Sequence, residues 1–171
     1  RKLTAYHEAG HAVCAHVLPN VSPVHQVTIV PRGRAGGFTM QLPVEDKFYA
    51  TKNEMKENIV VLLGGRVAEE LTLDDISTGA SNDLERVSAT ARNMVTKYGM
   101  SERLGTVLYG SEHSDDAVFL GRDFSNSQNY SEQTAAVIDE EIRKIISNAY
   151  TTCKEILTKH RDKLEFVAQF L

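Results

Sequence analysis

The sequence predicts a mainly helical domain with one small β-hairpin or edge sheet. The chain has 171 residues, of which 42% are hydrophobic and 25% charged, a balance that suits one globular domain and excludes disordered, collagen-like and coiled-coil chains. Apolar residues recur at helical spacing over most of the chain, whereas alternating β-favouring residues are confined to 24–30 and 38–42.

The net charge limits the classes of partner, and the cysteine content indicates the redox compartment. The chain carries 19 Lys and Arg against 23 Asp and Glu, a net charge of −4, which argues against a nucleic-acid partner and against direct contact with an anionic membrane. The longest apolar run, 59–63, is far shorter than the roughly 20 residues that span a bilayer. Two cysteines cannot form a disulfide framework, which suits a reducing compartment.

The first elements follow from proline and glycine placement. Residues 1–18 predict a helix that Pro19 ends, because proline lacks an N–H group and clashes with the preceding turn. The glycine-rich stretch 31–37 predicts the connection of a hairpin between strands 24–30 and 38–42. Prolines flank both strands, which favours a short edge sheet.

The second helix is predicted over 52–71. Thr51 and Glu54 have the spacing of a capping box, in which each side chain satisfies a free backbone N–H group of the other residue. Residues 59–63 are apolar on every side of this helix, so we expect them to be buried.

The remaining elements are predicted by weaker signals. Asn82 and Glu85 repeat the capping pattern less strongly, and Gly99 is the expected end of that helix. Residues 110–130 are polar, and their length predicts a mobile functional loop. Ser131 then caps a helix whose character continues intermittently to the C-terminus.

The first predicted helix carries a metal-binding pattern. His7, Glu8 and His11 form an H-E-x-x-H motif, and residues four apart differ by about 40° around a helix, so both imidazoles project from one face. Glu8 lies about 100° from His7, too far round to be the obvious third ligand. It is placed to act as the general base on a water that a bound zinc ion activates.

Spacing leaves the third ligand open. The glycine and histidine of the longer metzincin pattern are replaced by Cys14 and Val17, which excludes that arrangement. Cys14 shares a face with His7, but buried small residues are the commoner role of such a cysteine. Glu69 and Glu70 on a downstream helix, and Asp83 in the first turn of another, are carboxylate candidates that pattern reasoning does not separate.

Several motifs, in order along nearly the whole chain, resemble one family. They are 6–12 (YHEAGHA), 27–33 (VTIVPRG), 64–70 (GGRVAEE), 78–84 (TGASNDL), 99–105 (GMSERLG), 130–132 (YSE) and 139–141 (DEE). With these motifs the chain resembles the protease domain of the FtsH family, which are membrane-anchored AAA+ zinc metalloproteases.

This resemblance selects among the candidate residues. It implies that His7, His11 and Asp83 bind one Zn²⁺ per chain and that Glu8 is the catalytic general base. Glu69 and Glu70 would then be structural, or would support the metal helix without touching the metal.

The resemblance also implies where a substrate lies. An extended, unfolded or membrane-extracted polypeptide would pair with the strand at Gly36, Gly37, Phe38 and Thr39, through backbone hydrogen bonds that tolerate many side chains. Many family members carry a bulkier apolar residue at the position of Gly36, so we do not expect the family's side-chain preferences there.

The family architecture extends beyond this chain. The resemblance implies that 1–171 is a zinc metalloprotease domain cut from a longer protein, with an AAA+ ATPase module and membrane helices upstream. That ATPase would use the ATP, because this chain has no phosphate-binding loop. The parent protein is expected to be a homo-hexamer, membrane-anchored, with this domain on the cytoplasmic side. The alternative is a non-catalytic helical ring-assembly module with a structural zinc, although such a site would usually be closed by a fourth side chain.

Overall fold

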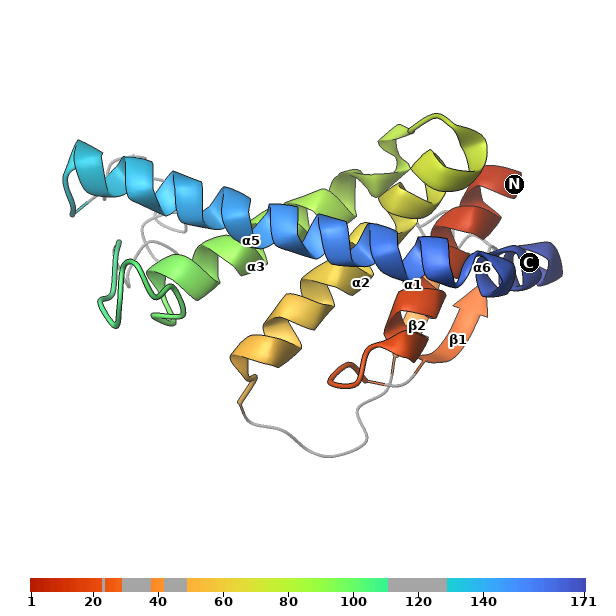
Figure 1. Ribbon diagram of the computed structural model, residues 1–171, viewed down its shortest axis with the longest axis horizontal. Helices are drawn as coiled ribbons and strands as arrows, with labels where there is room; N and C mark the ends of the chain where they lie inside the picture. The colour runs from red at the N-terminus through yellow and green to blue at the C-terminus, as the bar shows by residue number, and fades with distance from the viewer. Residues whose placement is uncertain (23, 29–37, 42–48, 111–128) are drawn as a thin grey trace, which may run out of the picture.

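The computed structural model describes residues 1–22, 24–28, 38–41, 49–110 and 129–171. Figure 1 shows a mainly helical molecule with one two-stranded ribbon, which confirms the predicted fold class. The elements, in chain order, are α1 (Lys2–Val17), β1 (Val24–Thr28), β2 (Phe38–Gln41), α2 (Lys52–Leu73), the 3₁₀ helix η1 (Thr78–Ala80), α3 (Ser81–Thr96), α5 (Glu132–Lys159) and α6 (Arg161–Phe170). The loop expected at 110–130 lies almost wholly outside the described residues.

Most helix boundaries agree with the local signals in the sequence. The Thr51 hydroxyl accepts a hydrogen bond from the Glu54 N–H at 3.1 Å, which confirms the start of α2. The Ser131 hydroxyl accepts one from the Thr134 N–H, also at 3.1 Å, at the start of α5. Both hydroxyls satisfy N–H groups that have no partner within the helix.

The predicted capping role of Asn82 is wrong. The residue before α3 is Ala80, which offers no side-chain cap, and Asn82 lies inside the first turn. The reason is that η1 runs directly into α3, with the Ser81 N–H bonded to the Thr78 carbonyl, so the chain already turns before Asn82 is reached. Asp83 keeps its expected place in the first turn.

Two glycines allow α1 and α2 to cross with their backbones in contact. A Cβ atom on Gly10 would lie 2.2 Å from the Gly64 carbonyl oxygen, and one on Gly64 would lie 2.7 Å from the Gly10 carbonyl oxygen. Neither distance is compatible with a side chain, so this crossing explains why the sequence accepts the cost of a mid-helix glycine at both positions.

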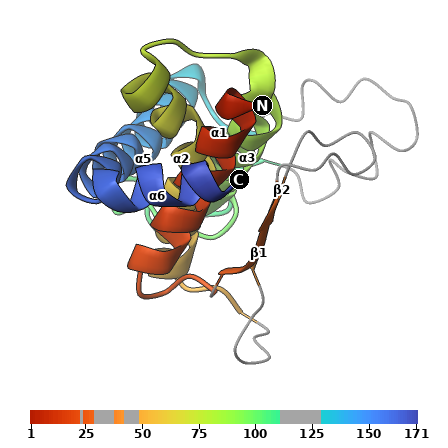
Figure 2. The same ribbon diagram turned by 90° about the vertical axis from the view of Figure 1, so that its right-hand side faces the viewer.

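The other helices enclose this crossing. Figure 1 shows α5 running along the long axis across α3, α2 and α1, with α6 at its end. Cys14 on α1 meets Cys153 on α5 in the core, with the sulfur atoms 3.7 Å apart. Figure 2 shows the antiparallel pair β1 and β2 at one side of the helices, as the predicted edge sheet requires. Among the helices in the described parts of the chain, none combines the length and the hydropathy of a membrane-spanning segment.

Candidate metal centre

Three potential ligand atoms converge between α1 and α3. The Nε2 atoms of His7 and His11 lie 3.1 Å apart, and one carboxylate oxygen of Asp83, Oδ2, lies 3.0 Å from the first and 3.1 Å from the second. The helical spacing of the histidines places both rings on one face of α1. Asp83 reaches them because it stands in the first turn of α3.

The far side of each imidazole fixes which nitrogen carries a proton. His7 Nδ1 lies 2.9 Å from Oε2 of Glu69, and His11 Nδ1 lies 2.6 Å from the backbone carbonyl oxygen of Val61. A carboxylate and a carbonyl only accept hydrogen bonds, so both Nδ1 atoms are the donors. In the neutral rings the Nε2 atoms are therefore the unprotonated nitrogens, which is the form that binds a metal. Without a metal, a hydrogen bond from Nε2 to Asp83 needs the protonated ring.

This donor set fits zinc. Tetrahedral coordination with zinc bonds of about 2.1 Å places neighbouring ligand atoms about 3.4 Å apart. The observed separations of 3.0 to 3.1 Å are within a few tenths of an ångström of that value. Among the described residues, His7, His11 and Asp83 form a group whose potential ligand atoms all lie within 4.8 Å of one another, close enough to hold a single ion.

The pKa values follow from the same contacts. Burial alone would lower the pKa of His7, but its hydrogen bonds with Asp83 and Glu69 outweigh that effect and raise it above 6.5. Burial would raise the pKa of Asp83, but hydrogen bonds with His11 and His7 outweigh it and hold the carboxyl far below its usual value. Asp83 is therefore a carboxylate at neutral pH, as a metal ligand must be.

Two further residues on α1 and α2 shape the site. Glu8 follows His7 in α1, and its side chain is only 6% exposed. Its negative charge is one of the smaller causes of the raised pKa of His7. Gly65 on α2 provides the space for the imidazole of His7, because a Cβ at that position would lie 2.4 Å from the ring.

The two neighbouring glutamates of α2 have different surroundings. Glu69 is fully buried, and its carboxylate contacts His7 and accepts a hydrogen bond from the Ser77 hydroxyl. Glu70 instead accepts a hydrogen bond from the Tyr150 hydroxyl on α5. The structure thus places Glu69, but not Glu70, against the Nδ1 atom of His7, a candidate ligand.

Two groups that support the histidines were missed by the sequence reasoning. One is the backbone carbonyl of Val61, which no side-chain pattern reveals. The other is the hydroxyl of Ser77, for which the only sequence signal is its place just before the segment that carries Asp83. The contact of His11 with Val61 joins residues 50 apart in the chain and depends on the packing of α1 on α2. The contact of Ser77 with Glu69 spans eight residues and depends on how the chain turns after α2.

The other candidates from the sequence lie elsewhere or outside the described residues. The sulfur of Cys14, which the sequence offers as a possible ligand, contacts the sulfur of Cys153 in the core. Gly36 and Gly37 lie outside the described residues. Phe38 and Thr39 belong to β2, which pairs with β1 through Thr28 and Val27.

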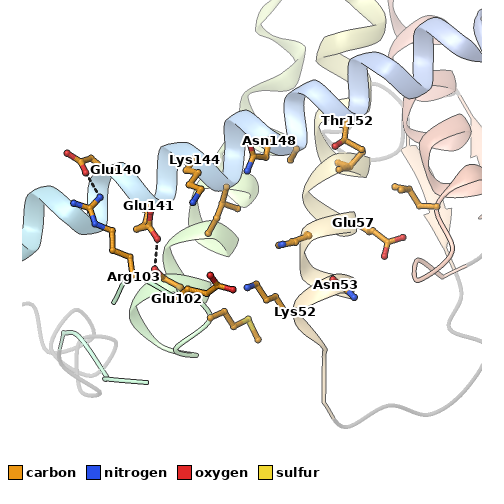
Figure 3. A pocket seen from close by; sticks show the side chains of 17 residues that line it. Lys52, Asn53, Glu57, Glu102, Arg103, Glu140, Glu141, Lys144, Asn148 and Thr152 are labelled. Atoms are coloured by element: carbon orange, nitrogen blue, oxygen red, sulfur yellow. Dashed lines mark hydrogen bonds and ion pairs between the residues drawn. The ribbon is translucent and has the colours of Figure 1, made fainter. Parts of the chain in front are cut away.

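A separate hollow lies between the N-terminal half of α2 and α5, with a volume of about 940 Å³. Figure 3 shows that its charged and polar side chains come mostly from α2, α5 and the segment after α3. Two contacts occupy its α5 wall, one between Arg103 and Glu140 and one between Ser101 and Glu141, both at 2.6 Å. None of the three candidate metal ligands lines this hollow.

Known sequences match this chain over its whole length. The profile described as Peptidase family M41 matches residues 1–171, which is the whole chain. The chain belongs to peptidase family M41. It is 64% identical over its full length to "ATP-dependent zinc metalloprotease FtsH 2" of Alkaliphilus metalliredigens, of which it covers 24%. It is 60% identical to FtsH 1 of Thermoanaerobacter sp. and 54% identical to FtsH of Bacillus subtilis, again over its full length, and covers 28% and 27% of these proteins.

These matches show the family of this chain and the class of its relatives. The family is one of peptidases, and the names of the relatives describe them as ATP-dependent zinc metalloproteases. The chain spans about a quarter of the length of the curated relatives it matches. The alternative of a non-catalytic ring-assembly module is not favoured.

Proposed function

We propose that this domain hydrolyses internal peptide bonds with one Zn²⁺ ion bound by His7, His11 and Asp83, and with Glu8 as the general base. The observation that carries the proposal is the convergence of three ligand atoms within 3.0 to 3.1 Å of one another, while Glu69 and Val61 hold the far side of both imidazoles.

Each residue has a distinct task in this proposal. Zinc at these ligands supplies Lewis-acid chemistry, polarising a peptide carbonyl and lowering the pKa of water. The Glu8 carboxylate takes the proton of the attacking water and returns it to the leaving amine. Burial of Glu8 (6% exposed) restricts competing contacts with bulk water. Glu69 keeps the Nδ1 proton of His7 in place, so that Nε2 remains a ligand.

We further propose how the substrate is held. Strand β2 pairs with β1 among the described residues, and an extended polypeptide could add to the ribbon by backbone hydrogen bonds near Gly36, Gly37, Phe38 and Thr39. This mode of binding suits unfolded or membrane-extracted polypeptides, because it depends little on side chains.

For the parent protein we propose the arrangement of an ATP-dependent, membrane-anchored protease. Residues 1–171 would form its protease domain, on the cytoplasmic side, with a AAA+ ATPase module delivering unfolded polypeptides. The subunits would assemble as a homo-hexamer. This proposal rests on the full-length match to relatives named ATP-dependent zinc metalloproteases and about four times as long.

Two substitutions test the catalytic proposal. Glu8→Gln removes the base and keeps the side-chain shape, so we expect loss of casein hydrolysis with close to one zinc per chain retained. Asp83→Ala removes a ligand, so we expect the purified domain to lose zinc. Zinc retained at one per chain by Asp83→Ala, or full activity in Glu8→Gln, would contradict the assignment.

A further inference from the structure

Ser77 lies on the connection between α2 and α3, and it has contacts on both sides. Its hydroxyl donates to Oε1 of Glu69 and accepts a hydrogen bond from the Gly79 N–H at 3.1 Å. Its backbone carbonyl faces the Arg66 guanidinium at 3.4 Å. Ser77 thus fixes the start of η1, the short helix that leads into α3 and Asp83.

The acceptor of this hydroxyl is a carboxylate that water does not reach. Glu69 is 0% exposed, and each of its oxygens has its own donor: Oε2 faces Nδ1 of His7, and Oε1 faces the hydroxyl of Ser77. A carboxylate held at both oxygens has one orientation. One held at a single oxygen can rotate away from its remaining partner, and the buried free oxygen carries a desolvation penalty.

We propose that Ser77 is a positioning residue of the metal centre. Its hydroxyl holds the Glu69 carboxylate in the plane in which Oε2 orients His7, and the same residue anchors the segment that brings Asp83 to the site. Ser77 therefore fixes the positions of two candidate ligands on different helices, His7 and Asp83, relative to each other. This inference rests on the proposed function, because it requires His7 and Asp83 to be metal ligands.

The backbone of Ser77 permits a matched pair of variants. Its φ of −126° and ψ of 174° are extended, a conformation that β-branched residues adopt readily. Ser77→Thr keeps the hydroxyl, and Ser77→Val has nearly the same shape without it. Ser81→Ala is the control, because it removes an exposed hydroxyl two residues before Asp83.

The measurement is the dissociation constant for Zn²⁺ alone, from competition with a chromogenic chelator on the purified domain. We expect it to rise about 10-fold in Ser77→Val, the low end of the range typical when the direct partner of a metal-binding histidine is lost, because Ser77 acts on His7 only through Glu69. It should stay within about threefold of wild type in Ser77→Thr and Ser81→Ala, since outer partners act through their hydrogen bonds. The visible absorption of the Co²⁺-loaded domain should change in Ser77→Val only, because it reports ligand geometry.

The outcomes separate this inference from the proposed function. Wild-type zinc affinity in Ser77→Val would overturn the role of Ser77. Equal losses in Ser77→Val and Ser77→Thr, or a loss in Ser81→Ala, would also overturn it, because the effect would then come from the local fold. Zinc retained by Asp83→Ala would instead overturn the proposed function, whatever the Ser77 variants show.

Discussion

Replacing Gly65 with alanine tests whether the imidazole of His7 must occupy the position seen here. The added Cβ would lie 2.4 Å from Cε1 and Nε2 of the ring, where ordinary contact begins at 3.4 Å. The ring must therefore move by about 1 Å, whereas metal sites tolerate deviations of about 0.2 Å. The neighbouring atoms belong to a side chain that can rotate, so the helices need not separate.

The expected result is loss of metal without loss of the fold. Removing a ligand should weaken zinc binding by more than the 10- to 100-fold typical of losing a ligand's outer partner. The metal-free domain should remain folded, because alanine gains about 1 kcal/mol of helix propensity over glycine, which offsets roughly one lost hydrogen bond of His7. The assay is competition for Zn²⁺ with a chelating dye, alongside thermal unfolding in EDTA.

Gly64→Ala is the matched control, with the opposite expectation. Its Cβ would meet the Gly10 carbonyl oxygen at 2.7 Å, and a backbone atom cannot rotate away. We expect a loss of about 1–3 kcal/mol in the free energy of unfolding, as overpacking commonly causes, with zinc still bound by the folded fraction. If Gly65→Ala bound one zinc per chain with wild-type affinity, the placement of His7 as a ligand would be refuted.

Three other predictions concern the surroundings of the ligands. Glu69→Ala should weaken zinc binding 10- to 100-fold, and Glu70→Ala should leave it unchanged in the same competition assay; a loss in both variants would contradict the distinction drawn from their contacts. Cys14→Ala should keep one zinc per chain by metal analysis and lower the free energy of unfolding in urea by about 1–2 kcal/mol, as should Cys153→Ala, because each empties space in the core. Burial lowers the pKa of His7, but its carboxylate partners outweigh burial and raise the pKa above 6.5. Protons compete with zinc for this ligand until the pH passes the raised pKa. Zinc affinity should therefore keep rising as the pH increases past 6.5. The same group stabilises the metal-free domain below pH 6.5, and that contribution should disappear as the pH rises through the raised pKa; a metal-free unfolding profile with no such change would count against the His7 contacts.

The sequence alone determined what depends on neighbours along the chain. Thr51 and Ser131 cap their helices because each hydroxyl acts on an N–H group three residues later. His7 and His11 share a face because the helix period places residues four apart side by side. Asn82 is not a cap, because the 3₁₀ helix η1 comes directly before α3 and already forms the first turn. The start of η1 is fixed by Ser77, which contacts Glu69 on α2.

Only the tertiary structure decided which carboxylate meets the two imidazoles. Glu69, Glu70 and Asp83 are equally plausible by chain position, because each lies on a helix downstream of the histidines. The backbone contact of Gly10 with Gly64 sets how α1 crosses α2, and that crossing places Glu69 at the Nδ1 side of His7. The packing of α2 against α5 places Glu70 against Tyr150. The Nε2 side is left to Asp83. Helix periodicity fixes the direction of a side chain relative to its own helix, but the packing of one helix on another fixes what that side chain meets.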